Sequence, residues 1–266
     1  MTVENEKRNT VAKAMLIFEK LREAGRPMSV KEIAQASELN KSSLHHHIKT
    51  LSELGYLTQD LESRKYDIGL KLVQLGQAYL QRMDVRERGH AFLEQLCRDL
   101  NQTVHMLLLD GNKVVYVDKI EPQYYPGALR CSSFIGMHTE IHSTASGKVL
   151  LSQLDETALG KVLDQISLSP TTIHTNTDID IFKQELEQTR KRGYGLEVQE
   201  HSIGLQCVAV PILNLNGECI AAISVSSQVA LVDHESLKSH ILSKLLDTGQ
   251  KISAEMGYSG AYIVAE

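Results

Sequence analysis

Residues 40–57 read NKSSLHHHIKTLSELGYL, and this stretch decides the fold of the N-terminal part of the chain. Asn40 is a favourable N-cap and Gly55 a favourable stop, so the stretch predicts a helix from Lys41 to Leu54. Its apolar residues recur every three to four positions, as on the buried side of an amphipathic helix: Leu44, Ile48, Leu51 and Leu54. The other side offers short donors and cations that suit phosphates and base edges, from Ser42, His45, His46 and Lys49.

Three consecutive histidines, His45 to His47, lie within this helix. Consecutive helical residues point about 100° apart, so the three rings cannot share one metal ion. His47 falls between Leu51 and Leu54 on the inward side and is predicted to be a partly buried ring. The polar outer face is also compatible with an ordinary solvated helix, so its interpretation depends on the neighbouring elements.

The neighbouring elements predict a winged helix-turn-helix. A first helix, capped by Asn9 or Thr10, extends to Gly25. A second, short helix begins at Ser29, which forms a capping box with Glu32. After the third helix, residues 56–59 and 65–68 predict two short strands of a hairpin. Basic residues near its tip, Arg64 and Lys65, place this hairpin as a wing beside DNA.

Residues 70–83 predict a helix that joins two domains. Its apolar stripe consists of Leu72, Leu75, Tyr79 and Met83. The stripe packs on its own domain, or it pairs with the same helix of another chain. We favour pairing, because one helix between two domains finds little surface of its own chain to cover it. A DNA-binding protein that contacts two half-sites also requires a dimer.

The second half of the sequence predicts an antiparallel α+β domain. Residues 103–109 and 113–120 form strands joined by Asp110-Gly111-Asn112, a strong hairpin signal. Two further strands are predicted at 206–213 and 218–226, and helices at 146–154, 157–165, 179–192 and 234–256. The whole chain is therefore assigned to the α+β class, with domains at 1–69 and 85–266 and the linker helix at 70–84.

Composition agrees with two globular domains. The prediction of DNA binding by the first domain rests on its pattern of helices and wing, because its net charge is small. The chain has 266 residues, of which 42% are hydrophobic and 23% charged, with a net charge of -5. Residues 1–80 hold 12 basic and 10 acidic side chains, so they only permit DNA binding. No apolar run approaches the ~20 residues of a membrane span, and the four cysteines form no CxxC pair. We expect a cytoplasmic protein without membrane contact.

Catalytic interpretations are weak. Residues 145–148 resemble the end of a phosphate-binding loop, but Val149 stands where Ser or Thr would bind magnesium. His138 and His142 have the spacing of metal ligands without a clear third ligand. An enzyme with Cys207 as nucleophile stays as the alternative, although a buried strand thiol is more often structural. We expect no enzyme, no cofactor and no metal. A third hypothesis is an interaction module that binds protein through the wing and the recognition helix.

The second domain offers a candidate pocket for a small ligand. Residues 142–147, HSTASG, precede a predicted helix whose first amides suit an anion such as a carboxylate. Ser224 and Ser226 share one face of their strand by its period of two, and they can converge with Cys207 of the neighbouring strand.

Several segments match one known family: residues 39–45, 51–57, 65–69, 143–150, 192–194, 204–211 and 222–226, together with Glu200. Over nearly its whole length the chain resembles the IclR family of bacterial transcriptional regulators. The resemblance implies a GAF-like or profilin-like effector-binding domain and homodimers or homotetramers that bind palindromic operator DNA. It also implies a small organic acid as effector, with sugar acids as the nearest class, and often the repression of catabolic genes.

The resemblance also assigns functional residues. The effector-binding positions fall on Ala145, Ser146, Glu197, Cys207, Ser224 and Ser226. The residues expected to contact DNA come from the polar face of the third helix and from the wing: Lys41, Ser42, Ser43, His45, His46, Lys49, Arg64 and Lys65. This sequence departs from the family at three of these or neighbouring positions: Glu197 replaces the usual Asp, His46 replaces Arg, and His47 replaces an aliphatic residue. The first departure affects the pocket, and the second affects base preference, because histidine lacks the guanidinium fork.

Overall fold

The computed structural model describes residues 9–122 and 132–261. The chain divides into two compact units, Met1–Arg82 and Met83–Glu266. Each unit has its own hydrophobic core and is described by itself. Within the described ranges, no helix combines the length and the apolar character that a membrane crossing requires.

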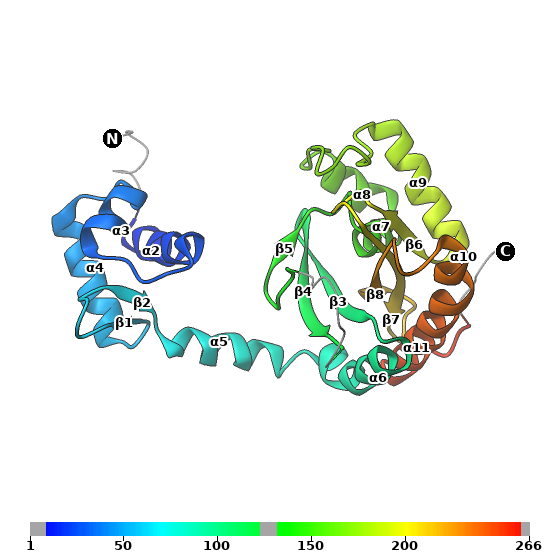
Figure 1. Ribbon diagram of the computed structural model, residues 1–266, viewed down its shortest axis with the longest axis horizontal. Helices are drawn as coiled ribbons and strands as arrows, with labels where there is room; N and C mark the ends of the chain where they lie inside the picture. The colour runs from blue at the N-terminus through cyan, green and yellow to red at the C-terminus, as the bar shows by residue number, and fades with distance from the viewer. Residues whose placement is uncertain (1–8, 123–131, 262–266) are drawn as a thin grey trace. The chain divides into compact units, whose positions relative to one another are not determined.

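The first unit is a winged helix-turn-helix (Figure 1). Its helices are α2 (Thr10–Ala24), α3 (Val30–Ser37) and α4 (Lys41–Glu53), followed by strands β1 (Leu57–Gln59) and β2 (Tyr66–Ile68) and helix α5 (Leu70–Leu80). The predicted caps are present: Asn9 accepts from Ala12, Ser29 and Glu32 form the capping box, and the Asn40 side chain accepts from the Ser43 amide at 2.8 Å. The three helices and the hairpin are thus confirmed.

The core of this unit explains where the predicted stripe on α4 ends. Leu44 and Ile48 are buried against Ile17, Leu21 and Ile33. Leu54, however, is 50% exposed, so its predicted burial was wrong. Helix α4 ends at Glu53, and the chain turns away through Gly55, which adopts a positive φ of 78°. The Leu54 amide still donates to the Thr50 carbonyl at 3.0 Å, so the chain turns only after this residue. At about 100° per residue, Leu54 lies at the edge of the stripe and not against the core.

Helix α5 ends earlier than predicted. It stops at Leu80, and Met83 precedes α6 (Asp84–Leu100), where it packs against the core of the second unit. The stripe through Met83 was therefore wrong. Within the described chain, Leu72 packs half-buried on the first core, whereas Leu75 and Tyr79 are 53% and 66% exposed.

The second unit contains a six-stranded antiparallel sheet in the order β5-β4-β3-β8-β7-β6. Strands β3 (Thr103–Asp110) and β4 (Lys113–Ile120) form one predicted hairpin, and β7 (Leu205–Leu213) and β8 (Cys219–Gln228) form the other. The edge strands β5 (His138–Thr139) and β6 (Gly195–Val198) and helix α6 were not predicted. The α+β fold class is confirmed.

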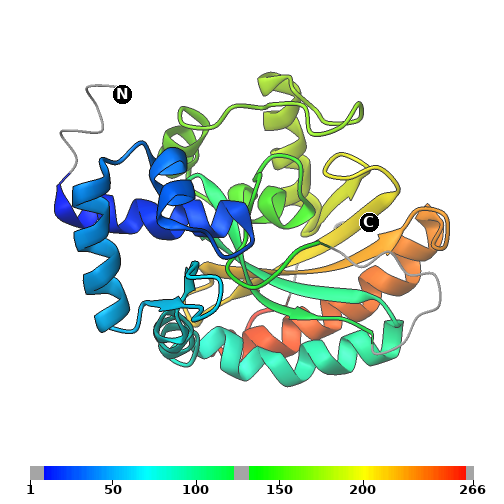
Figure 2. The ribbon, with the colours of Figure 1, turned by 60° about the vertical axis from the view of Figure 1, so that its left-hand side comes forward.

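Helices cover both faces of the sheet. On one face α6 packs beside the C-terminal helix (Figures 1 and 2), which consists of α10 (His234–Ser236), a π-helical turn (Leu237–Ile241) and α11 (Leu242–Glu255). The other core joins the sheet to α7 (Ala145–Ser152), α8 (Glu156–Leu163) and α9 (Ile179–Arg192). The residues of strand β8 alternate between the two faces. Ile223 and Val225 enter the core on the α6 side of the sheet, while Ser224 and Ser226 face the α7 side.

Candidate nucleic-acid interface and ligand pocket

The outer face of α4 presents most of the predicted DNA-binding residues. Five of them are exposed: Lys41, Ser42, His45, His46 and Lys49. The Lys49 ammonium lies 3.8 Å from the Glu53 carboxylate, a surface ion pair that contributes little and that phosphate can replace. The opposite face of α4 packs against the core, so these polar residues point away from it and can contact a ligand.

Ser43 and His47 form a pair inside the unit. The Ser43 hydroxyl lies 3.1 Å from His47 Nε2, and His47 is buried, as predicted. Burial lowers the pKa of His47, and His46 and Lys13 lower it further, so the ring is neutral. His47 therefore anchors α4 in place of an aliphatic residue. Ser43 is half-buried, and its hydroxyl supports this anchor.

The wing carries two predicted DNA-binding residues between its turn and β2, Arg64 and the half-buried Lys65. Register pairs Leu57 with Ile68 and Gln59 with Tyr66. Arg64 is exposed with a positive φ of 56°, and its carbonyl accepts from the Gln59 side chain at 3.0 Å. A groove between α4 and the hairpin has a volume of about 460 Å³ and is lined by His45, His46, Lys49, Gln59 and Tyr66, among others.

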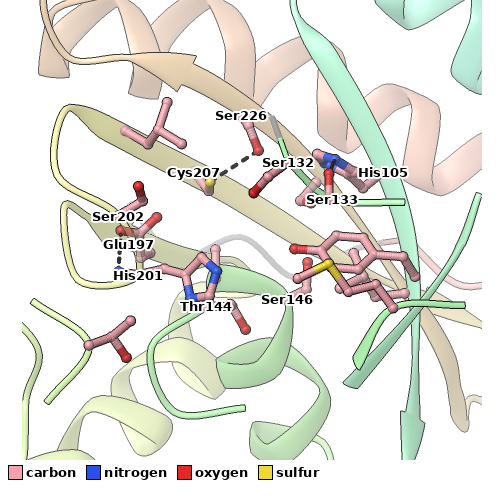
Figure 3. Close-up of a pocket in the computed structure, with 17 residues that line it drawn as sticks. His105, Ser132, Ser133, Thr144, Ser146, Glu197, His201, Ser202, Cys207 and Ser226 are labelled. Carbon is pink, nitrogen blue, oxygen red and sulfur yellow. Dashed lines mark hydrogen bonds between the residues drawn. The ribbon is translucent and has the colours of Figure 1, made fainter. Parts of the chain in front are cut away.

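In the second unit a cavity of about 270 Å³ contains all six predicted effector-binding positions in its wall (Figure 3). They come from four elements: α7, β6, β7 and β8. Cross-strand register explains why they meet, since Glu197 pairs with Cys207 and Cys207 pairs with Ser226. Residues directly opposite in an antiparallel sheet share one face. The Cys207 Sγ lies 3.1 Å from Ser226 Oγ.

The first turn of α7 forms the opposite wall. Thr144 caps the helix by accepting from the Gly147 amide at 3.2 Å, so α7 begins one residue before the predicted start at Ser146. A side chain at Gly195 would collide with the Ala145 carbonyl, so this glycine lets β6 approach α7 closely. Ser146 and Ser224 line the cavity at 3% and 4% exposure, and neither hydroxyl has a hydrogen-bond partner within the described residues. These hydroxyls are available to a ligand.

Glu197 is the acidic residue of the pocket wall. It is 1% exposed, and its Oε1 accepts from the backbone amides of Glu200 at 2.7 Å and His201 at 3.1 Å. Burial raises the pKa of Glu197 to about 7, although these amides and the Cys207 thiol favour the charged form. Near neutral pH the carboxyl therefore either donates or accepts a hydrogen bond.

Sequence reasoning missed several polar residues of the same wall. They are His105, Ser132, Ser133, Thr171, His201 and Ser202. A signal existed for His105, because it alternates with the apolar residues Val104 and Met106 in a predicted strand. The others lie in loops, where neither period nor spacing indicates which way a side chain points.

The described residues do not bring together the groups that a metal site at His138 and His142 would need. His138 Nε2 lies 2.6 Å from Asp110, whereas His142 Nε2 donates to the Ser169 carbonyl at 3.0 Å, so the two rings serve different partners. Among the described side chains, no group of three metal-binding residues exists. Cys207 contacts a hydroxyl and a carboxyl. Cys97, Cys207 and Cys219 form no disulfide bond among the described residues, and Cys131 lies outside them.

Comparison with known proteins identifies both units. Residues 10–61 match the IclR helix-turn-helix domain, and residues 77–254 match the bacterial transcriptional regulator IclR C-terminal domain. The chain is 34% identical over 249 residues to the HTH-type transcriptional regulator XynR of Escherichia coli, covering 94% of this chain and 97% of that protein.

Solved structures of related regulators point to the same family. The crystal structure of Thermotoga maritima IclR matches with a TM-score of 0.78 and 32% identity, over 94% of this chain and 99% of that one. The inducer-binding domain of the Acinetobacter transcription factor PobR, a double mutant in complex with 3-hydroxybenzoic acid, matches with a TM-score of 0.57 and 32% identity, over 61% and 94%. This chain therefore belongs to the IclR family of bacterial transcriptional regulators, with a DNA-binding helix-turn-helix domain and a C-terminal effector-binding domain.

Proposed function

We propose that the protein is a repressor whose operator binding is controlled by a small hydroxylated organic acid. The observation that carries the proposal is the convergence of the six assigned positions on one cavity, where Ser146 and Ser224 keep unpartnered hydroxyls. The amides of the first turn of α7 suit a carboxylate, because they are donors at the positive end of a helix dipole. Glu197 suits a hydroxyl on the same ligand. The acid bound by the related PobR domain carries both groups.

DNA contact is proposed for the outer face of α4 and the wing. Exposure supports Ser42, His45, His46 and Lys49 as residues that reach the major groove, and Arg64 as a residue that reaches phosphates. Lys65, beside Arg64 in the wing, is half-buried and is proposed for phosphate contact from its charge and position. Lys41 stands at the start of the helix, beside the same phosphates. Ser43 is a weaker member of the set, because its hydroxyl is held by His47.

A homodimer or homotetramer is proposed, because palindromic sites require two recognition helices. The exposed apolar side chains of α5, among them Leu75 and Tyr79, supply a surface for a second copy. We place the protein in the cytoplasm, where the DNA of a bacterium lies.

The test selects fragments of the host's own genomic DNA that the protein retains at physiological salt. The proposal predicts an enriched palindrome, and the variant His46→Arg is expected to change the preferred base at one position of each half-site. No enrichment even at low salt would contradict DNA binding and favour a protein-binding module. Turnover of a substrate that is lost in Cys207→Ala would favour the enzyme instead.

A further inference from the structure

The cavity extends one strand beyond the six assigned positions. Those positions lie on α7, β6, β7 and β8, whereas His105 lies on β3, where register pairs it with Ser224 of β8. Figure 3 shows His105, Ser132 and Ser133 on one side of the cavity and Glu197 and His201 on the other. Three strand spacings of about 4.8 Å separate the backbones of β3 and β6. The cavity thus has two polar ends.

We propose that His105 is a specificity-determining residue that binds a hydroxyl of the effector chain beyond Ser224, and so selects hydroxy acids longer than three carbons. This inference rests on the proposed function, because it assumes that the carboxylate binds at α7. It adds a second contact at the far end of the same cavity.

The chemistry of His105 suits a hydroxyl and not a second carboxylate. The side chain is 2% exposed, and its ring centroid lies 5.0 Å from that of Tyr116. Burial lowers the pKa of His105 to about 3, with a further contribution from Lys119, so the ring is neutral at physiological pH. A neutral imidazole has one donor and one acceptor, as a hydroxyl group does.

The surroundings hold this end of the cavity in place before a ligand arrives. His105 Nε2 lies 2.9 Å from the Ser133 hydroxyl, and the Lys119 ammonium donates to the Ser133 carbonyl at 2.7 Å. Lys119 also pairs with Glu121 at 3.0 Å, so its charge is already compensated. A hydrogen-bonding group that is fixed in advance costs less to order on binding.

The volume of the cavity suits an acid longer than three carbons. A volume of about 270 Å³ corresponds to roughly nine water molecules at about 30 Å³ each. A three-carbon acid bound at α7 would leave the His105 end to solvent. An acid of five or six carbons with hydroxyl groups would reach it.

The test compares ligands of two lengths on two proteins. Titration calorimetry measures glycerate, as the three-carbon probe, and a panel of five- and six-carbon aldonic acids and their 2-oxo-3-deoxy forms. The proteins are wild type and His105→Phe, which keeps a ring against Tyr116 but removes both nitrogens. We expect at least one longer acid to bind wild type roughly tenfold more tightly than glycerate, and His105→Phe to lose that gain while binding glycerate unchanged.

Two outcomes overturn the inference alone: glycerate binds wild type as tightly as every longer acid, or His105→Phe weakens short and long acids equally, as a purely structural role requires. Binding of no acid of either length would instead contradict the proposed function itself. If His105→Phe fails to fold, Ser133→Ala replaces it. That variant removes the hydroxyl beside His105 and is expected to weaken only the longer acids.

Discussion

The ammonium group of Lys148, which is fully buried on α7, lies 2.6 Å from a carboxylate oxygen of Glu200. The same ammonium lies 2.7 Å from Glu185 of α9. The Glu200 amide in turn donates to Glu197 at 2.7 Å, so one chain of contacts joins the buried charge to the pocket wall. The loop after β6 is thereby tied to α7.

Replacement of Lys148 by methionine is expected to lower the free energy of unfolding by about 3 kcal/mol, at the lower end of the range for a buried pair, because two partly buried carboxylates lose their counter-charge. Denaturant unfolding followed by circular dichroism measures this loss. The matched control is Lys251→Met, which removes an equally short but exposed pair with Asp247 and is expected to cost less than about 1 kcal/mol. Equal losses in the two variants would contradict the account of Lys148.

Glu197 makes stability depend on pH in a defined direction. Burial raises the pKa of Glu197 from its ordinary value of about 4.5 to about 7 in the folded protein, so the unfolded chain releases this proton at lower pH. The stability that the protonated carboxyl contributes is fully present below about pH 4.5 and is lost as pH rises through about 7. Glu197→Gln mimics the protonated form and removes this loss.

We therefore expect Glu197→Gln to gain stability relative to wild type between pH 5 and pH 7.5, by up to about 3 kcal/mol for a shift of this size. Urea unfolding of both proteins at several pH values provides the measurement. A difference between them that stays constant with pH would mean that Glu197 is ionised normally.

On the DNA side, Lys49→Ala and Arg64→Ala are each expected to weaken operator binding and to reduce the salt slope by about 0.9, because each removes one phosphate contact. Fluorescence anisotropy at several salt concentrations measures both quantities. Lys161→Ala, an exposed lysine of the other unit, serves as the control and should change neither. An unchanged slope in Lys49→Ala or Arg64→Ala would place that residue off the DNA.

For α5, the double variant Leu75→Glu with Tyr79→Glu is expected to shift the protein toward monomers in sedimentation velocity and to weaken operator binding, since one half-site offers too few contacts. Gln74→Glu with Gln77→Glu adds the same charge to polar positions of the same helix and should leave the assembly intact. A fully dimeric Leu75/Tyr79 variant would exclude α5 as the interface.

The sequence allowed the first unit to be predicted almost completely, because its signals are local: N-caps at Asn9, Ser29 and Asn40, one stripe on α4, and a short hairpin. The ends of helices were harder. Leu54 and Met83 continue an apolar stripe in the sequence. Leu54, however, caps the end of α4 at the edge of that stripe, and Met83 lies beyond the end of α5, and periodicity alone does not locate the end of a helix.

The pocket was predictable only in part. Alternation in β8 placed Ser224 and Ser226 on one face, and the run of small polar residues at 142–147 placed the start of α7 to within one residue. Glu197 came from family resemblance, because β6 is a four-residue edge strand without a periodic signal. His105 and the loop serines were missed, since which strand lies beside β8 is a tertiary fact that no local pattern contains.

The central claim is that the pocket and the operator site are coupled through one acid. It is tested most directly by titration calorimetry of wild type with the acid that binds most tightly, with and without operator DNA, and of Ser146→Trp, which fills the cavity. The account predicts that operator weakens acid binding by the factor by which the acid weakens operator binding, roughly 5–150-fold, and that Ser146→Trp binds operator but no acid. Tight binding of an apolar or cationic compound, an affinity that operator leaves unchanged, or acid binding by Ser146→Trp equal to that of wild type would contradict it.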